Sequence, residues 1–322
     1  MILPIPGCMP VTQGRFEVTG TTAPQFDRAA ERFTSFDGAP LGLTVWDAEA
    51  GDPEIVVVGI HGMNDWANAF FMAAPYWARH GVTTYGYDQR GFGRSPNRGI
   101  WPEEELLRED LRTAVRLARA AHPDAILVVV GISMGAAVAM STFGAEDAPE
   151  IDRLVLSGPG LRGWGALPIS YRTSLWMSAR IRPAWIVRPP RRFVRIEPTD
   201  NVEMLQEIWS NPLMLRENRI DQVHGVVSVM ETAHKRAPGL PAPTLVSYGA
   251  NDYVIPPQGM QRTSADFPDH VRTVYYPKGY HMLLRDLQAE TVWSDYLAFF
   301  RDPDAELPSG EGMFPWLKNQ SG

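Results

Sequence analysis

The sequence predicts an α/β fold in which a mostly parallel sheet carries helices on both faces. The first observation is that short apolar strands alternate with helical stretches along most of the 322 residues. The second is that the most apolar strand, Ala125–Ile132, runs through a Gly-x-Ser-x-Gly turn directly into an Ala-rich helix, Met134–Phe143. Apolar strands of this kind are typical of parallel sheets, whose two faces are both covered by helices.

Each expected element follows from a local pattern. Asp37-Gly38 is a turn signal, so the runs Arg32–Phe36 and Leu41–Trp46 on either side should form an antiparallel hairpin. Glu103–Ala121 should be an amphipathic helix, because its apolar residues recur every three or four positions. The other expected strands are Glu54–Ile60, Val82–Tyr87, Arg153–Ser157, Thr244–Tyr248 and Arg272–Tyr276, and the other expected helices are Asn68–His80 and Leu287–Phe300.

The same alternation divides the chain into four parts. Residues 1–30, rich in Pro, Gly and Thr, should form a loosely held N-terminal arm, and residues 303–322 a polar tail on the surface. Residues 31–159 and 239–302 form the α/β core. Between them, residues 160–238 are helical and rich in Trp and Arg, and they form an insertion between two strands.

The composition excludes several classes of protein. Lys and Arg number 30 against 37 Asp and Glu, a net charge of −7, so no nucleic-acid partner is expected. The single cysteine, Cys8, excludes an intrachain disulfide and a cysteine zinc cluster. The uncharged run over residues 125–145 is long enough for a membrane span, but a strand, a turn and a helix explain it better. No integral membrane span is therefore expected.

The N-terminus leaves two locations open. As written, the sequence has no signal peptide and predicts a cytoplasmic protein. The tetrapeptide ending in Cys8 loosely resembles the end of a bacterial lipoprotein signal, in which the cysteine is lipidated. No basic and apolar segment precedes it here. The alternative is a lipoprotein anchored to a membrane through Cys8, if the true start lies upstream.

Ser133 is the candidate nucleophile. It occupies the centre of Gly131-Ile132-Ser133-Met134-Gly135, between a strand and a helix, which is the context in which this motif is informative. A sharp turn there exposes the hydroxyl. A serine hydroxyl is a poor nucleophile at neutral pH and needs a base, which in turn needs an orienting carboxylate.

Asp252 and His281 are the candidate acid and base, in the chain order that this architecture uses. Asp252 follows the end of the strand Thr244–Tyr248, and His281 follows the last strand. The carboxyl ends of parallel strands are where such sheets build their sites. Asp252 could instead be a turn or cap residue, with Asp286 orienting His281.

The oxyanion donors are expected from two backbone N–H groups. One is that of Met134, directly after the nucleophile, and the other is that of Met63, in the loop after the first long central strand. His61 in the same loop is expected to hold the loop in shape rather than to act as a base. Asp88 and Arg90 are expected to brace the loops around the site.

Five segments together resemble the α/β-hydrolase superfamily, and within it the monoacylglycerol lipase and bacterial lysophospholipase group of serine aminopeptidase S33-like hydrolases. They are His61–Asp65, Tyr87–Ser95, Gly131–Gly135, Gly249–Asp252 and Gly279–Asp286. The resemblance implies an eight-stranded sheet, a lid over the site formed by residues 160–238, and ester hydrolysis without a cofactor. Position by position it implies the roles given above for Ser133, Asp252, His281, Met63 and Met134.

The sequence departs from the family's pattern at two places. Ala136 follows Gly135, whereas many members carry a second glycine after the first. Asn64 follows Met63, whereas many lipases have a further glycine in this loop. The second change bears on acyl-group preference more than on the mechanism.

The predicted function is that of a serine ester hydrolase acting on a small ester or a monoacyl lipid. No metal, nucleotide or flavin signature appears. A peptidase or amidase on the same scaffold, a transferase, and a catalytically silent lipid-binding protein remain alternatives. An acyl pocket is one interpretation of the apolar residues of the insertion, and packing of the insertion is the other; these residues are Trp164, Leu167, Trp176, Met204, Leu213, Met214, Val227 and Met230.

The insertion also carries a pattern that fits a membrane surface. Residues 153–196 contain no Asp or Glu, and arginines interleave with aromatic residues in the second half of this span. Those arginines are Arg172, Arg180, Arg182, Arg188, Arg191, Arg192 and Arg195, and the apolar residues among them are Trp176, Trp185, Ile186 and Phe193. Either this segment rests on an anionic lipid surface, or its arginines pair with acidic residues of the core.

Overall fold

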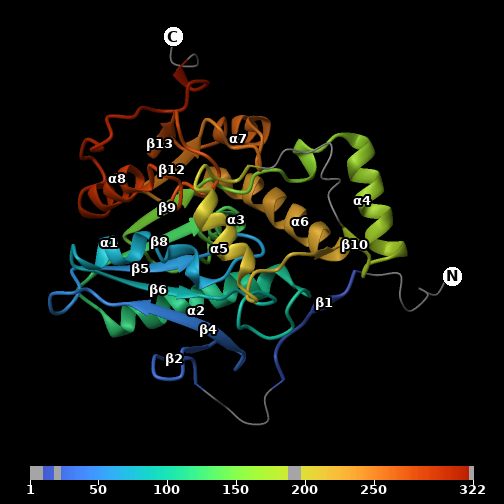
Figure 1. The fold of residues 1–322 in the computed structure, drawn as a ribbon, viewed down its shortest axis with the longest axis horizontal. Helices are drawn as coiled ribbons and strands as arrows, with labels where there is room; N and C mark the ends of the chain where they lie inside the picture. The colour runs from blue at the N-terminus through green and yellow to red at the C-terminus, as the bar shows by residue number, and fades with distance from the viewer. Residues whose placement is uncertain (1–9, 18–22, 188–196, 319–322) are drawn as a thin grey trace.

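The computed structural model describes residues 10–17, 23–187 and 197–318, so Cys8 and the arginines at 188, 191, 192 and 195 lie outside the described residues. Its centre is a nine-stranded sheet with the spatial order β13-β12-β9-β8-β5-β6-β4-β3-β2 (Figure 1). These strands are β2 (Gln25–Asp27), β3 (Arg32–Thr34), β4 (Pro40–Trp46), β5 (Ile55–Ile60), β6 (Val82–Tyr87), β8 (Ile126–Ile132), β9 (Arg153–Ser157), β12 (Thr244–Gly249) and β13 (Val271–Tyr276). Neighbours from β13 to β6 are parallel, and β4, β3 and β2 are antiparallel to their neighbours.

The mostly parallel sheet with helices on both faces is confirmed, but it has nine strands rather than eight. The additional strand is β2, which comes from residues expected to belong to the loose N-terminal arm. Phe26 in β2 stacks on Tyr85 with ring centroids 4.8 Å apart and meets Phe33 edge-on at 5.3 Å. This aromatic packing holds a strand too short to show periodicity in the sequence.

Helices cover both faces of the sheet. They are α1 (Ala73–Ala78), α2 (Glu104–Ala121), α3 (Met134–Phe143), α4 (Ile169–Ile181), α5 (Val202–Ser210), α6 (Ile220–Arg236), α7 (Pro257–Ser264) and α8 (Ala289–Arg301), with short 3-10 turns η1 (Ala67–Phe70), η2 (Trp164–Ala166) and η3 (Ala237–Gly239). Alternate side chains of β5 face opposite layers, so Val56 and Val58 pack with α2, α3 and α6, whereas Ile55 and Val57 pack with α1 and α8.

The predicted helix Asn68–His80 is wrong as a single element, because the structure divides it into η1 and α1. Pro75 lies inside the predicted range and becomes part of the first turn of α1. A proline has no N–H to donate and its ring clashes with the carbonyl four residues earlier, so a continuous helix through this point is disfavoured.

Both ends of the described chain are held more firmly than expected. Strand β1 (Thr12–Gln13) pairs in parallel with β7 (Trp101–Pro102), and the Val11 N–H donates to Asp221 of α6 at 3.3 Å. In the C-terminal tail, Phe314 is fully buried and joins the same core cluster as Val56. Parts of the arm and the tail therefore belong to the packed molecule.

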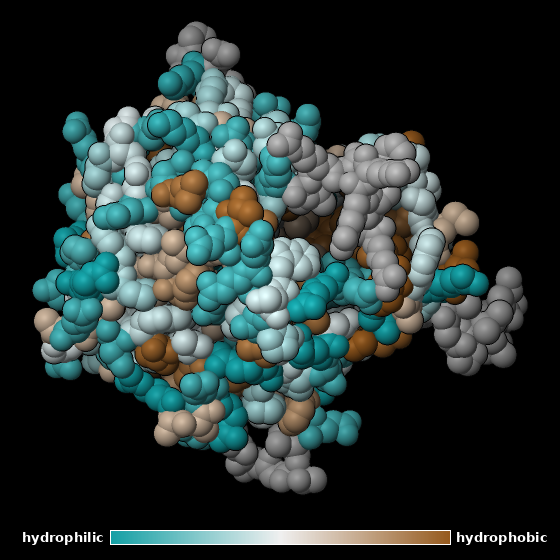
Figure 2. All heavy atoms as spheres, viewed as in Figure 1, coloured by the Kyte–Doolittle hydropathy of each residue, from teal (hydrophilic) through white to brown (hydrophobic). Residues whose placement is uncertain are grey.

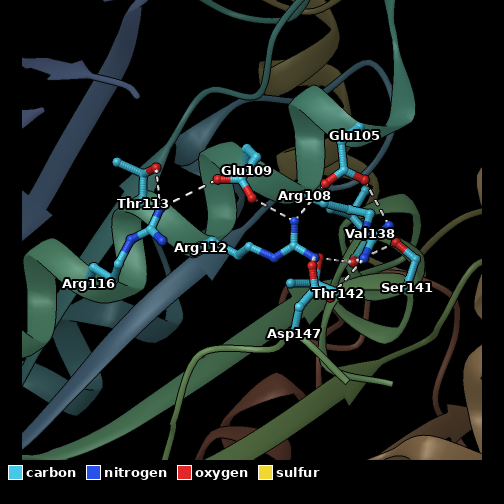
Figure 3. Close-up of polar contacts among 10 residues, drawn as sticks. All are labelled: Glu105, Arg108, Glu109, Arg112, Thr113, Arg116, Val138, Ser141, Thr142 and Asp147. Carbon is cyan, nitrogen blue, oxygen red and sulfur yellow. Dashed lines mark hydrogen bonds and ion pairs between the residues drawn. The ribbon is translucent and has the colours of Figure 1, made fainter. Parts of the chain in front are cut away.

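An ionic cluster fixes the helical layer that contains α3, the helix directly after Ser133 (Figure 3). The guanidinium of Arg112 in α2 is almost fully buried and donates at 2.7 Å to each of Glu105, Glu109 and Asp147. The first two carboxylates lie on α2, and Asp147 follows α3. Because one planar cation binds three carboxylates, the cluster ties the end of α3 to α2.

The insertion between β9 and β12 contains α4, α5 and α6, together with a two-stranded ribbon of β10 (Ile186–Val187) and β11 (Asn218–Arg219). Helix α6 packs against α3, whereas α4 stands at the edge of the molecule, away from the sheet (Figure 1). Ala179 is the only buried residue of α4. Apolar atoms accordingly reach the surface on this side (Figure 2). No helix among the described residues is long and apolar enough to cross a membrane.

Candidate active site

The turn between β8 and α3 holds Ser133 in a strained backbone conformation, with φ 52° and ψ −114°. Positive φ is rare for a residue with a side chain and costs on the order of 1–3 kcal/mol. The turn is fixed by neighbours: the Ser133 N–H donates to the Ser157 carbonyl at 3.0 Å, and the Ser133 carbonyl accepts from Gly160 at 2.9 Å. The hydroxyl is thereby presented at the carboxyl end of the central strand.

The glycines on either side of Ser133 are required by close packing. A Cβ atom at Gly131 would lie 2.7 Å from the Cα of Ala136, and one at Gly135 would lie 2.3 Å from the carbonyl oxygen of Ile60. Both contacts are too short for any side chain. The Gly-x-Ser-x-Gly pattern therefore has a steric reason here, because α3 starts against β5 with no space between them.

His281 and Asp252 meet Ser133 in one hydrogen-bonded line. His281 Nε2 lies 2.9 Å from Ser133 Oγ, and His281 Nδ1 lies 2.7 Å from Asp252 Oδ2. The other carboxylate oxygen of Asp252 accepts the N–H groups of Val254 and Ile255 at 2.9 and 2.8 Å. The carboxylate is therefore fixed by the backbone on one side and holds the imidazole on the other. All three predicted residues lie together, and each is at most 9% exposed.

Asp286, the alternative partner for His281, lies elsewhere. Its Oδ2 accepts the Tyr280 N–H at 2.7 Å, whereas His281 Nδ1 faces Asp252. Burial raises the pKa of Asp286 to about 6. Asp286 thus shapes the loop that carries the histidine, and it does not contact the imidazole in the manner of a triad acid.

The two predicted oxyanion donors, Met63 and Met134, belong to segments that neighbour Ser133. Met134 is the first residue of α3, where N–H groups have no acceptor within the helix. Met63 follows Gly62, at which a Cβ atom would lie 3.2 Å from the Cβ of Ser133. The loop after β5 is thus packed against the serine. A side chain at Gly62 would be tightly packed against Ser133, and the backbone of this loop lies close to the serine.

His61 is bonded in a way that fits a structural role. Its Nδ1 lies 2.7 Å from the Gly62 carbonyl, and its Nε2 lies 2.8 Å from the backbone nitrogen of Gln89. The Gln89 side chain donates back to the His61 carbonyl at 2.7 Å. Complete burial lowers the pKa of His61, which favours the neutral ring. A neutral ring can donate through Nδ1 and accept at Nε2, so both nitrogens serve the backbone.

The motif Tyr87–Ser95 braces the same region. The buried carboxylate of Asp88 accepts the N–H groups of Ala67 and Arg94 at 2.8 and 2.7 Å. Arg90 donates to Asp37 at 2.6 Å and to Asp110 at 2.7 Å, with all three side chains buried. Neither Asp88 nor Arg90 is bonded to a triad residue, so their observed contacts are structural.

The family model described as "Serine aminopeptidase, S33" matches residues 51–288 of the chain. The chain belongs to this family. The predicted α/β-hydrolase fold and the monoacylglycerol lipase-like group are therefore confirmed, and the protein is a carboxylic ester hydrolase by class.

Among relatives of this S33 hydrolase is the monoacylglycerol lipase of Mycolicibacterium smegmatis (strain ATCC 700084 / mc(2)155). It is 27% identical over 286 residues, covering 83% of this chain and 95% of the relative. Similar solved structures include the monoacylglycerol lipase of Paleococcus ferrophilus, with TM-score 0.67, 19% identity, and 81% of this chain and 98% of that chain covered. A soluble variant of monoglyceride lipase from Saccharomyces cerevisiae, in complex with a substrate analog, has TM-score 0.69, 18% identity, and coverage of 90% and 98%.

One feature of the S33 hydrolase's site was missed by reasoning from the sequence. Arg285 donates to Asp65, and both side chains are buried. Asp65 lies two residues after Met63, and Arg285 lies four residues after His281. The pair therefore joins the oxyanion-side loop to the histidine loop. Both residues stood inside recognised motifs, but nothing in the sequence showed that they face each other.

An apolar cavity of about 380 Å³ lies between α4 and α6 of the hydrolase. It is lined by Arg162, Leu167, Tyr171, Ser174, Leu175, Ser178, Ile220, Val223, Val226, Val227, Met230 and Ile255. Met230 packs at Gly160, next to the carbonyl of Ser133, and Ile255 is bonded to Asp252. Two lining residues thus neighbour the segments that hold Ser133 and Asp252, although Ser133, Asp252 and His281 do not line the cavity themselves.

The suggested pocket residues divide into three sets. Leu167, Val227 and Met230 line this cavity. Trp164 and Trp176 line a second groove on the other side of α4. Met204 and Met214 are buried in a separate apolar cluster around Trp66, with Leu213 packed against it, so they support the insertion instead of lining the cavity. Among the described residues, no cluster of three or more His, Cys, Asp or Glu side chains is arranged to hold a metal ion.

Proposed function

We propose that this S33 hydrolase cleaves monoacyl lipids or related carboxylic esters by a Ser133–His281–Asp252 triad and an acyl-enzyme. The observation that carries the proposal is the hydrogen-bonded line from Asp252 Oδ2 through His281 to Ser133 Oγ. The apolar cavity beside it suits an acyl chain, since ligand sites are mostly apolar with a few placed polar groups. The relatives named monoacylglycerol lipase support the same substrate class.

In this mechanism, Ser133 Oγ attacks the ester carbonyl while His281 Nε2 accepts the hydroxyl proton. Asp252 holds the ring so that Nε2 faces the serine, and it stabilises the imidazolium that forms. The N–H groups of Met63 and Met134 donate to the oxyanion of the tetrahedral intermediate. His281 then protonates the leaving alcohol and activates a water molecule, which releases the acid from Ser133.

A peptidase or amidase on the same scaffold has less support. An aminopeptidase needs a negative group to hold the free α-amine of its substrate. In the part of the chain that the structure describes, the residues that line the apolar cavity include no Asp or Glu, and the one charged residue among them is a cation, Arg162. The chemistry of the cavity therefore favours an uncharged or negatively charged substrate. A catalytically silent lipid-binding protein would not need the strained turn at Ser133.

We further propose that residues 160–238 act as the lid and that α4 rests on an anionic lipid surface. Six large apolar side chains between residues 169 and 185 are exposed: Ile169, Tyr171, Trp176, Met177, Ile181 and Trp185. The alternative is that the arginines of this segment pair with acidic residues of the core, and two of the described arginines have other contacts. Arg172 donates to backbone carbonyls, and Arg180 lies over the ring of Trp176 at 3.9 Å.

The deciding experiment is hydrolysis of p-nitrophenyl esters from acetate to palmitate, of monoacylglycerol and of lysophosphatidylcholine. Ser133→Ala should lower kcat by about 10⁴-fold or more, because it removes the nucleophile. The matched control is Ser141→Ala on the same helix, since that hydroxyl donates only to the Val138 carbonyl. Equal turnover by wild type and Ser133→Ala would show that Ser133 is not the nucleophile.

A further inference from the structure

Among residues 10–17, 23–187 and 197–318, Arg162 is the only charged residue that lines the apolar cavity between α4 and α6. The other lining residues are apolar apart from Tyr171, Ser174 and Ser178. Arg162 both lines the cavity and is exposed to solvent, so it belongs to the rim of the cavity. A long arginine stem can lie along an apolar wall while its charged end stays in water.

The position of Arg162 brings its charge close to the reacting atoms. The chain passes from β9 under the nucleophile, where the Gly160 N–H donates to the Ser133 carbonyl at 2.9 Å, and reaches Arg162 two residues later. Ile255, which lines the same cavity, donates to Asp252 at 2.8 Å. The rim at Arg162 therefore lies within the reach of a substrate whose ester carbonyl is at Ser133.

The charge of Arg162 is not compensated by the described part of the chain. Within residues 10–17, 23–187 and 197–318, it makes no hydrogen bond, ion pair or ring contact. Its neighbours differ in this respect. Arg262 is paired with Glu231 at 3.0 Å, and Arg172 donates to the carbonyls of Leu167 and Gly165. Arg162 thus keeps all its donors available beside an apolar surface, where a charge is screened less than in open water.

We propose that Arg162 is a specificity-determining residue that favours esters carrying an anionic group, a carboxylate or a phosphate. This rests on the proposed function. A planar guanidinium binds both groups with paired hydrogen bonds. The anion can belong to the alcohol, as in a lysophospholipid with a terminal phosphate, or to the acyl chain, as in the half-ester of a dicarboxylic acid.

The test compares four substrates of one chain length: 1-dodecanoylglycerol, 1-dodecanoylglycerol 3-phosphate, methyl dodecanoate and monomethyl dodecanedioate. The first and third are neutral, the second carries its anion on the alcohol, and the fourth carries it on the acyl chain. Arg162→Gln should raise KM for one of the anionic substrates about tenfold and leave both neutral substrates within twofold. Arg162→Lys should restore most of the loss, since it keeps the charge.

The control is Arg216→Gln, because Arg216 is exposed, does not line the cavity and, among the described residues, donates only to the Ser210 carbonyl. It should leave KM for all four substrates unchanged. The substrate that responds identifies which side of the ester bears the anion. Equal effects of Arg162→Gln on neutral and anionic substrates, no effect on either, or neutral turnover without anionic turnover would overturn the proposal. Failure of the wild type to hydrolyse any ester would instead refute the proposed function.

Discussion

Ser133, the proposed nucleophile, has a backbone conformation that favours glycine. Its φ of 52° and ψ of −114° are held by hydrogen bonds from β9 and from Gly160, not by its own preference. The strain is therefore borne by the packing of β5, β8 and α3 around it. Strain at this position would bring no benefit to a protein that does not use Ser133 in catalysis.

The strain can be measured with two inactive variants. Ser133→Gly should have a free energy of unfolding about 1 kcal/mol higher than Ser133→Ala, because glycine adopts this conformation without a Cβ clash. Urea unfolding of both variants at one pH gives the difference, and the hydroxyl is absent from both. If Ser133→Ala proved as stable as Ser133→Gly, the turn would not be strained in solution.

Asp286 should make stability depend on pH. Burial raises its pKa from 3.8 to about 6 in the folded state, so the folded protein binds the proton more tightly than the unfolded chain. The stability that this proton contributes is full below about pH 4 and is lost as the pH rises through 6. Asp286→Asn removes this titration and keeps an acceptor for the Tyr280 N–H.

Between pH 4 and pH 7.5 the wild type should lose this contribution, whereas Asp286→Asn should not. The free energy of unfolding of Asp286→Asn, relative to that of wild type, should therefore rise by about 2 kcal/mol over this range. Urea unfolding of both proteins at these two pH values measures the change. Asp269→Asn, at an exposed position, serves as the control and should show no such trend. A difference that is the same at both pH values would contradict the assigned protonation.

At the scale of elements, the sequence predicted best where a periodic pattern was long. The helix expected at Glu103–Ala121 is α2, one residue shorter, and the strand expected at Val82–Tyr87 is β6. Strands β1, β2 and β7 have two or three residues and are held by pairing with distant segments, so no local pattern could reveal them. The break between η1 and α1 could have been predicted, because Pro75 lies within the predicted helix Asn68–His80.

The same distinction holds for the site. The sequence predicted Ser133, His281 and Asp252 as a triad because each follows the end of a predicted strand, inside a motif whose chemistry is specific, and the structure brings their side chains within hydrogen-bonding distance. The bond between Asp65 and Arg285 joins residues 220 positions apart, and the cavity depends on how α4 lies on α6. Such contacts are set by tertiary packing, on which a single sequence carries no direct signal.

Helix α4 should bind vesicles through its apolar and cationic side chains. Trp176→Ser should weaken binding to vesicles that contain phosphatidylglycerol several-fold, because it removes an exposed indole. Wild-type binding should fall as salt increases and should be weaker on phosphatidylcholine alone. Trp209→Ser, an exposed tryptophan on α5, is the matched control and should change little. Equal partition of wild type onto neutral and anionic vesicles would refute the docking of α4.

At the scale of the molecule, the C-terminal tail closes the core on the side of β12 and β13. Phe314 is fully buried and lies edge-on to Tyr248, with ring centroids 6.2 Å apart, and its N–H donates to Thr273 at 3.3 Å. A segment that looks polar in the sequence thus contributes one of the large buried side chains. Its burial adds to the same cluster that packs α3 onto the sheet.

Phe314→Ala should lower the free energy of unfolding by about 3–4 kcal/mol, because it leaves a cavity in a packed core. The neighbouring Met313 is 49% exposed, so Met313→Ala should cost less than about 1 kcal/mol. Thermal and urea unfolding of the two variants, measured side by side, test whether the tail is part of the folded unit. Similar costs for both substitutions would place Phe314 outside the core.

The insertion is attached to the core unequally, and this has a consequence for how the enzyme can change. Val226, Val229 and Ala233 of α6 belong to the main core cluster, whereas α4 buries a single alanine. Substitutions in α6 are therefore constrained by folding, whereas folding places little constraint on α4. The two helices form opposite walls of one cavity. Substitutions in α4 can therefore change the range of substrates with little loss of stability, both in evolution and in designed libraries.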